Sequence, residues 1–126
     1  LKTSTPTWVA VPEDRDFDGA DDTLHIPRAG DGLDMRALML ELGRRGVTSV
    51  LIEGGGATLA SAFEADVVDK VMFFVAPKII GGAQAVSAVE GQGAARLADA
   101  VQLTAMKTRK VGCDILIEAY VNRKRT

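Results

Sequence analysis

Residues 47–63, VTSVLIEGGGATLASAF, decide the fold of this chain. A β-branched run leads into Glu53, three consecutive glycines and a helix of small residues. Glycine lets the backbone approach a ligand closely, and the free N–H groups at a helix start favour an anion. The stretch therefore predicts a strand, a phosphate-binding turn and a helix. A purely structural strand-to-helix turn is the alternative, and the spacing differs from the G-x-G-x-x-G dinucleotide fingerprint.

Upstream of this stretch, the sequence predicts two strands and a helix. Residues 7–11 and 23–28 read as short strands on either side of an acidic loop at 13–22. After Asp34, apolar residues recur at intervals of three and four, which predicts an amphipathic helix. Asp34 is the expected N-cap of this helix and Gly46 its stop.

A βαβ unit is expected around the glycines. Residues 47–52 are nearly all apolar, which predicts a central strand covered on both faces. The following helix should end near Asp66, and residues 67–77 form another strand closed by proline. A strand, a helix and a strand in this order predict a right-handed crossover.

The last third of the chain predicts a loop and a hairpin. Residues 78–95 are rich in Gly, Ala and Ser and indicate a long loop with at most one helical turn. Residues 101–110 and 114–121 indicate two antiparallel strands around a turn at Val111-Gly112. The expected fold is α/β, with parallel units first and an antiparallel pair last.

Composition indicates one globular domain over residues 1–126. Its 47% hydrophobic content argues against disorder, and a net charge of −2 gives no reason to expect nucleic acid or an anionic membrane as partner. No apolar run reaches the roughly 18 residues of a membrane span, and no signal-peptide pattern is present. A cytoplasmic protein is the default, with residues 123–125 as a solvated basic end.

Single cysteine and histidine residues exclude several kinds of site. Cys113 alone cannot form an intrachain disulfide or a thiolate metal site, and its strand-like setting predicts a small core residue. His25 is expected at the surface, which argues against a Ser-His-Asp or Cys-His hydrolase. Asp21 and Asp22 are assigned to the acidic loop, and no metal site is predicted.

A longer string, GVTSVLIEGGGATLASAFEADVVDKVMFFVAPKIIGG, resembles the C-terminal reductase domain of the bifunctional riboflavin-biosynthesis deaminase-reductase. That domain is a member of the dihydrofolate-reductase-like superfamily. The upstream RALMLELGRRG helix and the closing VGCDILIEAYV strand also fit, so nearly the whole chain is covered. The resemblance implies a dihydrofolate-reductase-like mixed sheet flanked by helices.

The resemblance implies an NADPH-dependent reduction of 5-amino-6-(5-phosphoribosylamino)uracil, with hydride transfer to C1′ of the opened ribose. Glu53 would contact the substrate, and Gly54-Gly55 is a candidate cis bond. No catalytic residue is assigned. The residues implied in cofactor binding are Gly54, Gly55, Gly56, Ala57, Thr58, Leu59, Ala60 and Ser61. Lys78 is expected to be a solvated or structural lysine, and Gly81-Gly82 to form a turn.

The family's first strands and its zinc deaminase signatures do not occur in this sequence, so the chain resembles a truncated piece of the domain. Three readings follow: a reductase fragment of riboflavin synthesis, another dihydrofolate-reductase-like enzyme acting on a pterin or pyrimidine, or a non-catalytic dimerisation or nucleotide-binding module. Apolar strands near residues 70–76 and 114–121 suit a subunit interface, so a homodimer is expected.

Overall fold

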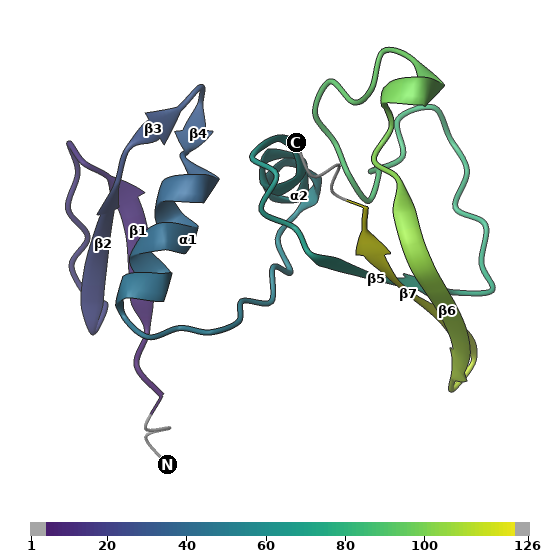
Figure 1. Ribbon diagram of the computed structural model, residues 1–126, viewed down its shortest axis with the longest axis horizontal. Helices are drawn as coiled ribbons and strands as arrows, with labels where there is room; N and C mark the ends of the chain where they lie inside the picture. The colour runs from purple at the N-terminus through teal and green to yellow at the C-terminus, as the bar shows by residue number, and fades with distance from the viewer. Residues whose placement is uncertain (1–4, 123–126) are drawn as a thin grey trace. The chain divides into compact units, whose positions relative to one another are not determined.

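A computed structural model describes residues 5–122 of the 126-residue chain (Figure 1). The chain divides into two compact units. The first runs to Glu53 and includes Glu64–Val67, and the second comprises Gly54–Phe63 and the chain from Val68. The basic residues 123–125, predicted as a solvated end, lie outside the described residues. The single domain expected from length stays a prediction.

The first unit joins a parallel strand pair to a helix. Strand β1 pairs with β2 from Trp8↔Asp22 to Pro12↔Ile26, and the connection between them carries no helix. Its elements are β1 (Trp8–Pro12), β2 (Asp22–Ile26), β3 (Arg28–Ala29), β4 (Gly32–Leu33) and α1 (Met35–Arg44). The two strands and α1 lie at or near their predicted positions.

Local sequence signals explain the bounds of α1. The Asp34 carboxylate accepts hydrogen bonds from the backbone N–H groups of Arg36 and Ala37, both at 2.9 Å. At the other end, Gly46 has a φ of 85°, which favours glycine, and Val47 N donates to Leu42 O at 3.0 Å. The predicted N-cap and stop are both confirmed.

The strand predicted at residues 47–52 is wrong in this structure. These residues belong to no strand among the described residues, and Val50 and Leu51 are 44% and 74% exposed. An apolar run predicts burial, but a strand exists only where a neighbouring backbone supplies hydrogen bonds. The expected βαβ unit around the glycines is therefore not formed.

The second unit contains helix α2 and a three-stranded antiparallel sheet in the order β5-β7-β6. Strand β7 is central, and β5 and β6 are its two edges. The elements are α2 (Gly56–Glu64), β5 (Lys70–Val75), the 3₁₀ turn η1 (Leu97–Asp99), β6 (Leu103–Val111) and β7 (Asp114–Val121). The predicted hairpin is confirmed, and the single helical turn falls just beyond the predicted loop.

The turn of the β6–β7 hairpin differs by one residue from the prediction. Val111 pairs with Asp114, so the turn residues are Gly112, with a φ of 60°, and Cys113. Cys113 is exposed, so its predicted place in the core is wrong. A residue in a two-residue turn has no sheet face on which to be buried.

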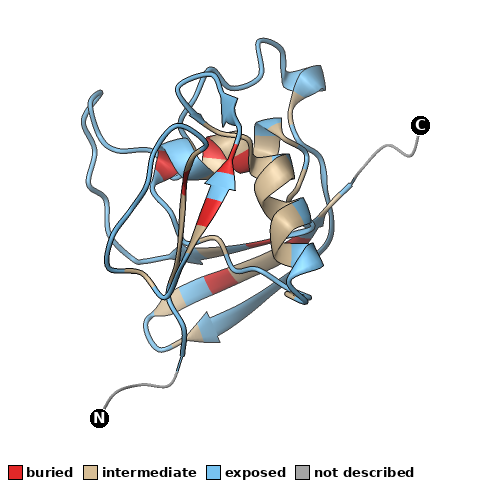
Figure 2. Ribbon diagram, turned by 90° about the vertical axis from the view of Figure 1, so that its left-hand side faces the viewer, coloured by how far each residue is buried: buried red, intermediate tan, exposed pale blue. Residues whose placement is uncertain are grey.

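Each unit has its own small core, seen as short red segments in Figure 2. The buried apolar residues are Val11, Leu24 and Ile26 in the first unit and Ala60, Ala62, Val71, Leu116 and Ala119 in the second. The predicted mixed α/β class is confirmed, since parallel and antiparallel pairs are both present. No helix within residues 5–122 is long and apolar enough to cross a membrane.

Candidate functional site

The start of helix α2 is the centre of the candidate site. Residues 54–61 lie together in the second unit, as one turn and the first part of the helix. Leu59 N donates to Gly55 O at 3.1 Å, which is the first helical hydrogen bond. Within residues 5–122, no side chain caps the free N–H groups ahead of it, and the first turn has no acidic residue. This helix start is open to an anion.

Two of the three glycines have close neighbours. A methyl group added to Gly54 would lie 2.6 Å from Thr58 Cβ, and one added to Gly56 would lie 2.5 Å from Glu90 Cγ. Gly54, Gly55 and Gly56 all have an ordinary negative φ, so backbone conformation is not the reason for glycine here. Thr58 Cβ is fixed to the helix backbone, so space requires glycine at position 54. The close neighbour of Gly56 is the exposed side chain of Glu90, which can move.

Neither packing nor backbone conformation requires glycine at Gly55. A methyl group added there would meet nothing within 4 Å, and φ is acceptable for any residue. The space on this side of Gly55 is where a bound group could approach the backbone closely, as glycines in phosphate turns allow. The residues present therefore fit a phosphate.

The remaining predicted cofactor residues differ in accessibility. Ala57 and Thr58 are exposed in the first turn, whereas Ala60 is 6% exposed. Leu59 is half-buried. The Ser61 hydroxyl donates to Ala57 O at 3.1 Å. The surface available for an anion is therefore concentrated at the first turn of α2.

Glu53 precedes the glycines and belongs to the first unit, whereas Gly54 belongs to the second. It is exposed and forms no hydrogen bond or ion pair with another described residue, so its carboxylate oxygens are available as acceptors. The peptide bond between Gly54 and Gly55 is trans, so the predicted cis bond is wrong in this structure.

Glu90 is a residue at this helix start that the sequence analysis missed. It lies in the long loop between β5 and β6, and its backbone N–H donates to Gly56 O at 3.1 Å. Its Cδ and Oε1 lie 2.8 and 2.9 Å from the position of a methyl group on Gly56. Thirty-four positions separate the two residues in sequence, and no local pattern signals their contact.

Lys78 and the pair Gly81-Gly82 lie in the same loop. Lys78 is exposed, as expected of a solvated lysine. Gly81 and Gly82 have φ values of 68° and 91°, and Gly82 O accepts from Ala85 N at 3.2 Å, so Gly82 begins a turn.

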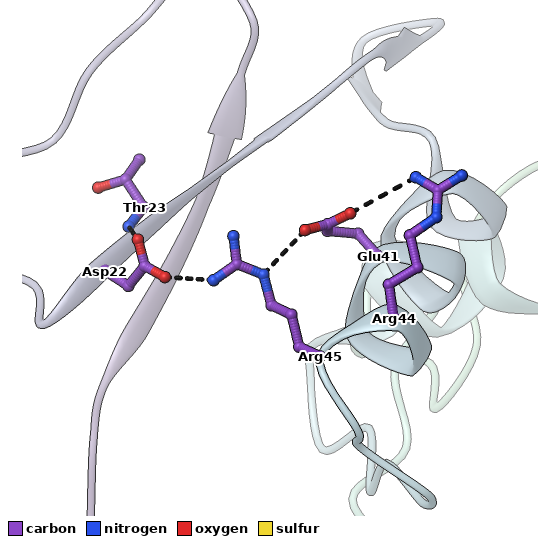
Figure 3. A network of polar contacts seen from close by, with 5 residues as sticks. All are labelled: Asp22, Thr23, Glu41, Arg44 and Arg45. Carbon is purple, nitrogen blue, oxygen red and sulfur yellow. Dashed lines mark hydrogen bonds and ion pairs between the residues drawn. The ribbon is translucent and has the colours of Figure 1, made fainter.

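The first unit contains a polar network around Arg45 (Figure 3). Its guanidinium donates to Asp22 of β2 and, at 2.8 Å, to Glu41 of α1, and lies 5.4 Å from the centre of the Trp8 ring. Hydrogen bonding to Arg45 lowers the pKa of Asp22 and of Glu41. The guanidinium is satisfied inside the unit, so the network links the end of α1 to the strands.

A second ionic cluster crosses the sheet of the second unit. Glu118 of β7 accepts from Lys70 of β5 at 2.6 Å and lies 3.7 Å from Arg109 of β6. Hydrogen bonding to Lys70 lowers the pKa of Glu118, and the same bond raises the pKa of Lys70. This cluster joins all three strands and is structural in character.

Side chains of the acidic loop and its neighbours pair locally. Asp21 accepts from Thr7 N at 2.6 Å, Asp14 lies 3.5 Å from Arg28, and Asp16 lies 3.4 Å from the exposed His25. Over residues 5–122, no group of three or more His, Cys, Asp or Glu side chains is arranged to hold a metal ion.

Comparison with known proteins adds a family match. Residues 1–117 match the family described as the RibD C-terminal domain. The chain is 36% identical over 89 residues to the riboflavin biosynthesis protein RibD of Actinobacillus pleuropneumoniae, covering 71% of this chain and 24% of that protein. It is 40% identical over 91 residues to the riboflavin biosynthesis protein PYRR, chloroplastic, of Arabidopsis thaliana, covering 72% of this chain and 15% of that protein.

A third relative has a name that states a reaction. The 2,5-diamino-6-ribosylamino-4(3H)-pyrimidinone 5′-phosphate reductase of Methanothermobacter thermautotrophicus is 32% identical over 89 residues, covering 71% of this chain and 41% of that protein. The chain thus spans less than half the length of each of these three relatives.

Proposed function

Because the chain belongs to the RibD C-terminal domain family, we propose that it is the reductase part of a riboflavin-biosynthesis enzyme. The reaction is the NADPH-dependent reduction of 5-amino-6-(5-phosphoribosylamino)uracil to its ribitylamino product. The relative from Methanothermobacter, named as a reductase of a ribosylaminopyrimidinone phosphate, supports this class of chemistry.

The cofactor assignment rests on one observation, the open space around Gly55. Gly54 and Gly56 have close neighbours in Thr58 and Glu90, but Gly55 has open space and an ordinary φ. Gly43 has the same freedom but lies inside α1, whereas Gly55 directly precedes the first turn of α2, and this position supports close approach of a ligand. The cofactor residues proposed are therefore those of the turn and of the first part of α2, residues 54–61.

The residues of the chain have separate roles in this proposal. Free N–H groups at the start of α2 bind the cofactor phosphates, and the helix dipole strengthens their attraction. Glu53 accepts hydrogen bonds from hydroxyl or amino groups of the substrate. Bound NADPH supplies the hydride that C1′ of the opened ribose receives, and the protein contributes mainly placement and electrostatics.

The name of one relative favours a second candidate substrate. The name of the Methanothermobacter relative specifies a 2,5-diamino pyrimidinone, which still has the amino group that the uracil lacks. Both compounds have a ribosylamino phosphate in which C1′ is reduced. Rates measured with each compound, followed by the loss of NADPH absorbance, decide between the two substrates.

The cofactor site is tested by calorimetry with NADPH and NADH on the wild-type chain, Gly55→Asp and Gly43→Asp. Gly43 is a matched control, since a side chain there also meets nothing within 4 Å and it lies on α1 in the first unit. Gly55→Asp should weaken NADPH binding at least about tenfold, because it adds a negative charge and bulk where the phosphates approach. Gly43→Asp should bind as the wild type does.

Three outcomes contradict the proposal of an NADPH site at the start of α2. They are a folded wild-type chain that binds no NADPH, an equal effect of both aspartates, and stronger binding of NADH. The first two remove the site, and the third changes the cofactor. Circular dichroism of each variant establishes that the chain is folded.

A homodimer and a cytoplasmic location complete the proposal. Apolar side chains exposed on the sheet, among them Met72 and Phe74 of β5 and Tyr120 of β7, support self-association. The edges β5 and β6 provide backbone groups for a further strand. Sedimentation velocity tests the dimer, and a monomer at micromolar concentration would contradict it. The cytoplasmic location rests on the sequence alone.

A further inference from the structure

The two edges of the sheet in the second unit differ in charge and in regularity. Strand β6 has three basic residues within four positions, namely Lys107, Arg109 and Lys110. Its register with β7 shifts just before them, and Ala105, within the shift, has a φ of 51°. Charged side chains and bulges are features that keep an edge strand from pairing with another chain. The edge at β6 is therefore protected.

Strand β5 has neither feature. Its register with β7 is unbroken from Lys70 to Val75, and residues 71–75 are all apolar. Met72 and Phe74 lie on one face of the sheet and are 47% and 59% exposed. Within residues 5–122, β5 pairs with β7 alone, and no other hydrogen bond reaches the backbone of residues 71–75. This edge is apolar, regular and unprotected.

The one charge on β5 does not oppose pairing along this edge. Lys70 is the first residue of the strand, and its ammonium donates to Glu118 of β7 at 2.6 Å. A pairing that spans residues 71–75 leaves Lys70 outside the paired span.

We propose that β5 pairs antiparallel with β5 of a second copy of this chain, with the two-fold axis at Phe73. Directly opposite residues of an antiparallel pair share a face of the sheet, so a two-fold axis between identical strands passes between a residue and its own copy. Val71 then lies opposite Val75 of the second copy, and Met72 lies opposite Phe74. The inference rests on the homodimer of the proposed function and assigns its interface.

A second copy suits this edge because residues 71–75 are complementary to themselves. Every directly opposite pair is apolar, and Met72 and Phe74 of both copies gather on one face, where pairing removes half-exposed side chains from water. Two three-stranded sheets become one continuous sheet. The same arrangement at β6 would place basic residues opposite or beside one another, which is destabilising.

Sedimentation equilibrium of the wild-type chain, Phe74→Lys and Met106→Lys distinguishes the two edges. Met106 is the matched control, since it is an apolar residue of β6, 67% exposed, in the shifted part of the register. Phe74→Lys should raise the dimer dissociation constant at least about tenfold, because it places unpaired charges in the apolar cluster. Met106→Lys should dimerise as the wild type does, and circular dichroism establishes that each variant is folded.

Disulfide formation in a Cys113→Ser background tests the register, since the exposed Cys113 would otherwise react. Met72→Cys and Phe74→Cys chains, mixed under mild oxidation, should form a cross-linked heterodimer, because opposite side chains of an antiparallel pair come within reach of a disulfide. Each chain alone should cross-link more slowly than the mixture.

The outcomes separate this inference from the proposed homodimer. A wild-type dimer that Phe74→Lys leaves intact, or that Met106→Lys weakens equally, keeps the homodimer and overturns pairing at β5. Cross-linking of either chain alone that equals or exceeds that of the mixture overturns the register centred on Phe73. A wild-type chain that is monomeric at micromolar concentration overturns both the homodimer and its interface, while calorimetry tests the NADPH site separately.

Discussion

The first backbone N–H groups of a helix have no acceptor inside it, and α1 and α2 differ in what these groups bind. At α1, the Asp34 carboxylate accepts from two backbone N–H groups at 2.9 Å and closes the helix end. At α2, three glycines precede or begin the helix, and no side-chain cap is found in the described part of the chain. A helix start closed by its own side chain serves the fold, whereas one left open can bind a ligand.

The difference also concerns why each residue is needed. Asp34 is explained by the bonds it makes within the first unit. Gly55 makes no comparable contact, and its surroundings would accept a side chain. The comparison therefore predicts that substitutions at the start of α1 affect stability alone, whereas those at the start of α2 separate into effects on stability and on binding.

The largest effect on stability is expected from Gly54→Ala. The added methyl group would lie 2.6 Å from Thr58 Cβ, which is fixed to the helix backbone and cannot rotate away. The free energy of unfolding should fall by about 1–3 kcal/mol, as for other overpacked sites. Urea unfolding followed by circular dichroism measures it. Gly55→Ala is the control and should stay within about 0.5 kcal/mol of the wild type. Equal stability of the two variants would contradict the distinction between these glycines.

Asp34→Ala should have the next largest effect. Loss of the cap leaves two N–H groups without their acceptor and should lower the free energy of unfolding by about 0.5–2 kcal/mol. Asp34→Asn keeps an oxygen at the same position and should recover most of the loss. The NADPH affinity of the folded variants should not change. Weaker binding by Asp34→Ala would contradict the prediction that substitutions at the start of α1 affect stability alone.

Low pH is expected to have a smaller effect on stability, through the ion pairs of Arg45 at the C-terminal end of α1. The Arg45 guanidinium lowers the pKa of Asp22 and Glu41 below their ordinary values of 3.8 and 4.5. As pH falls, the two carboxylates are protonated in the unfolded chain before they are protonated in the folded one. The ion pairs with Arg45 therefore stabilise the fold at neutral pH, and this stabilisation is lost as pH falls through the folded pKa values. Urea midpoints measured as pH falls below these ordinary values should decrease.

Arg45→Met tests the cause of this pH dependence. The variant should show a shallower fall in its urea midpoint with acid than the wild type does. Arg44→Met is the matched control, because Arg44 is more exposed and its one ion pair within residues 5–122, to Glu41, is 3.6 Å long. A slope in Arg45→Met equal to that of the wild type would rule out the Arg45 network as the source.

Elements with local signals were predictable from the sequence. The bounds of α1 follow from Asp34, the apolar spacing and Gly46, and each of these signals acts on the backbone within a few residues of itself. The β6–β7 hairpin follows in the same way from alternation around a glycine turn. The phosphate site at the glycine turn before α2 stays a prediction, and the different surroundings of its three glycines became visible only through the contacts of Thr58 and Glu90.

Features that depend on distant partners were not predictable. Residues 47–52 have the composition of a central strand, but strand formation depends on a neighbouring backbone that the composition does not specify. Cys113 has strand-like neighbours, yet a shift of the turn by one residue exposes it. Glu90 lies in a loop without periodicity, so only the folded chain shows that it reaches Gly56.

The contact of Arg45 with Trp8 also makes the first unit observable by itself. Trp8 is the only tryptophan in the sequence, and its ring lies beside a guanidinium held by two carboxylates. Its fluorescence therefore reports on the first unit, while a dye attached to the exposed Cys113 would report on the hairpin of the second. One molecule thus offers two optical signals, and comparison of their unfolding curves tells whether its two halves melt together.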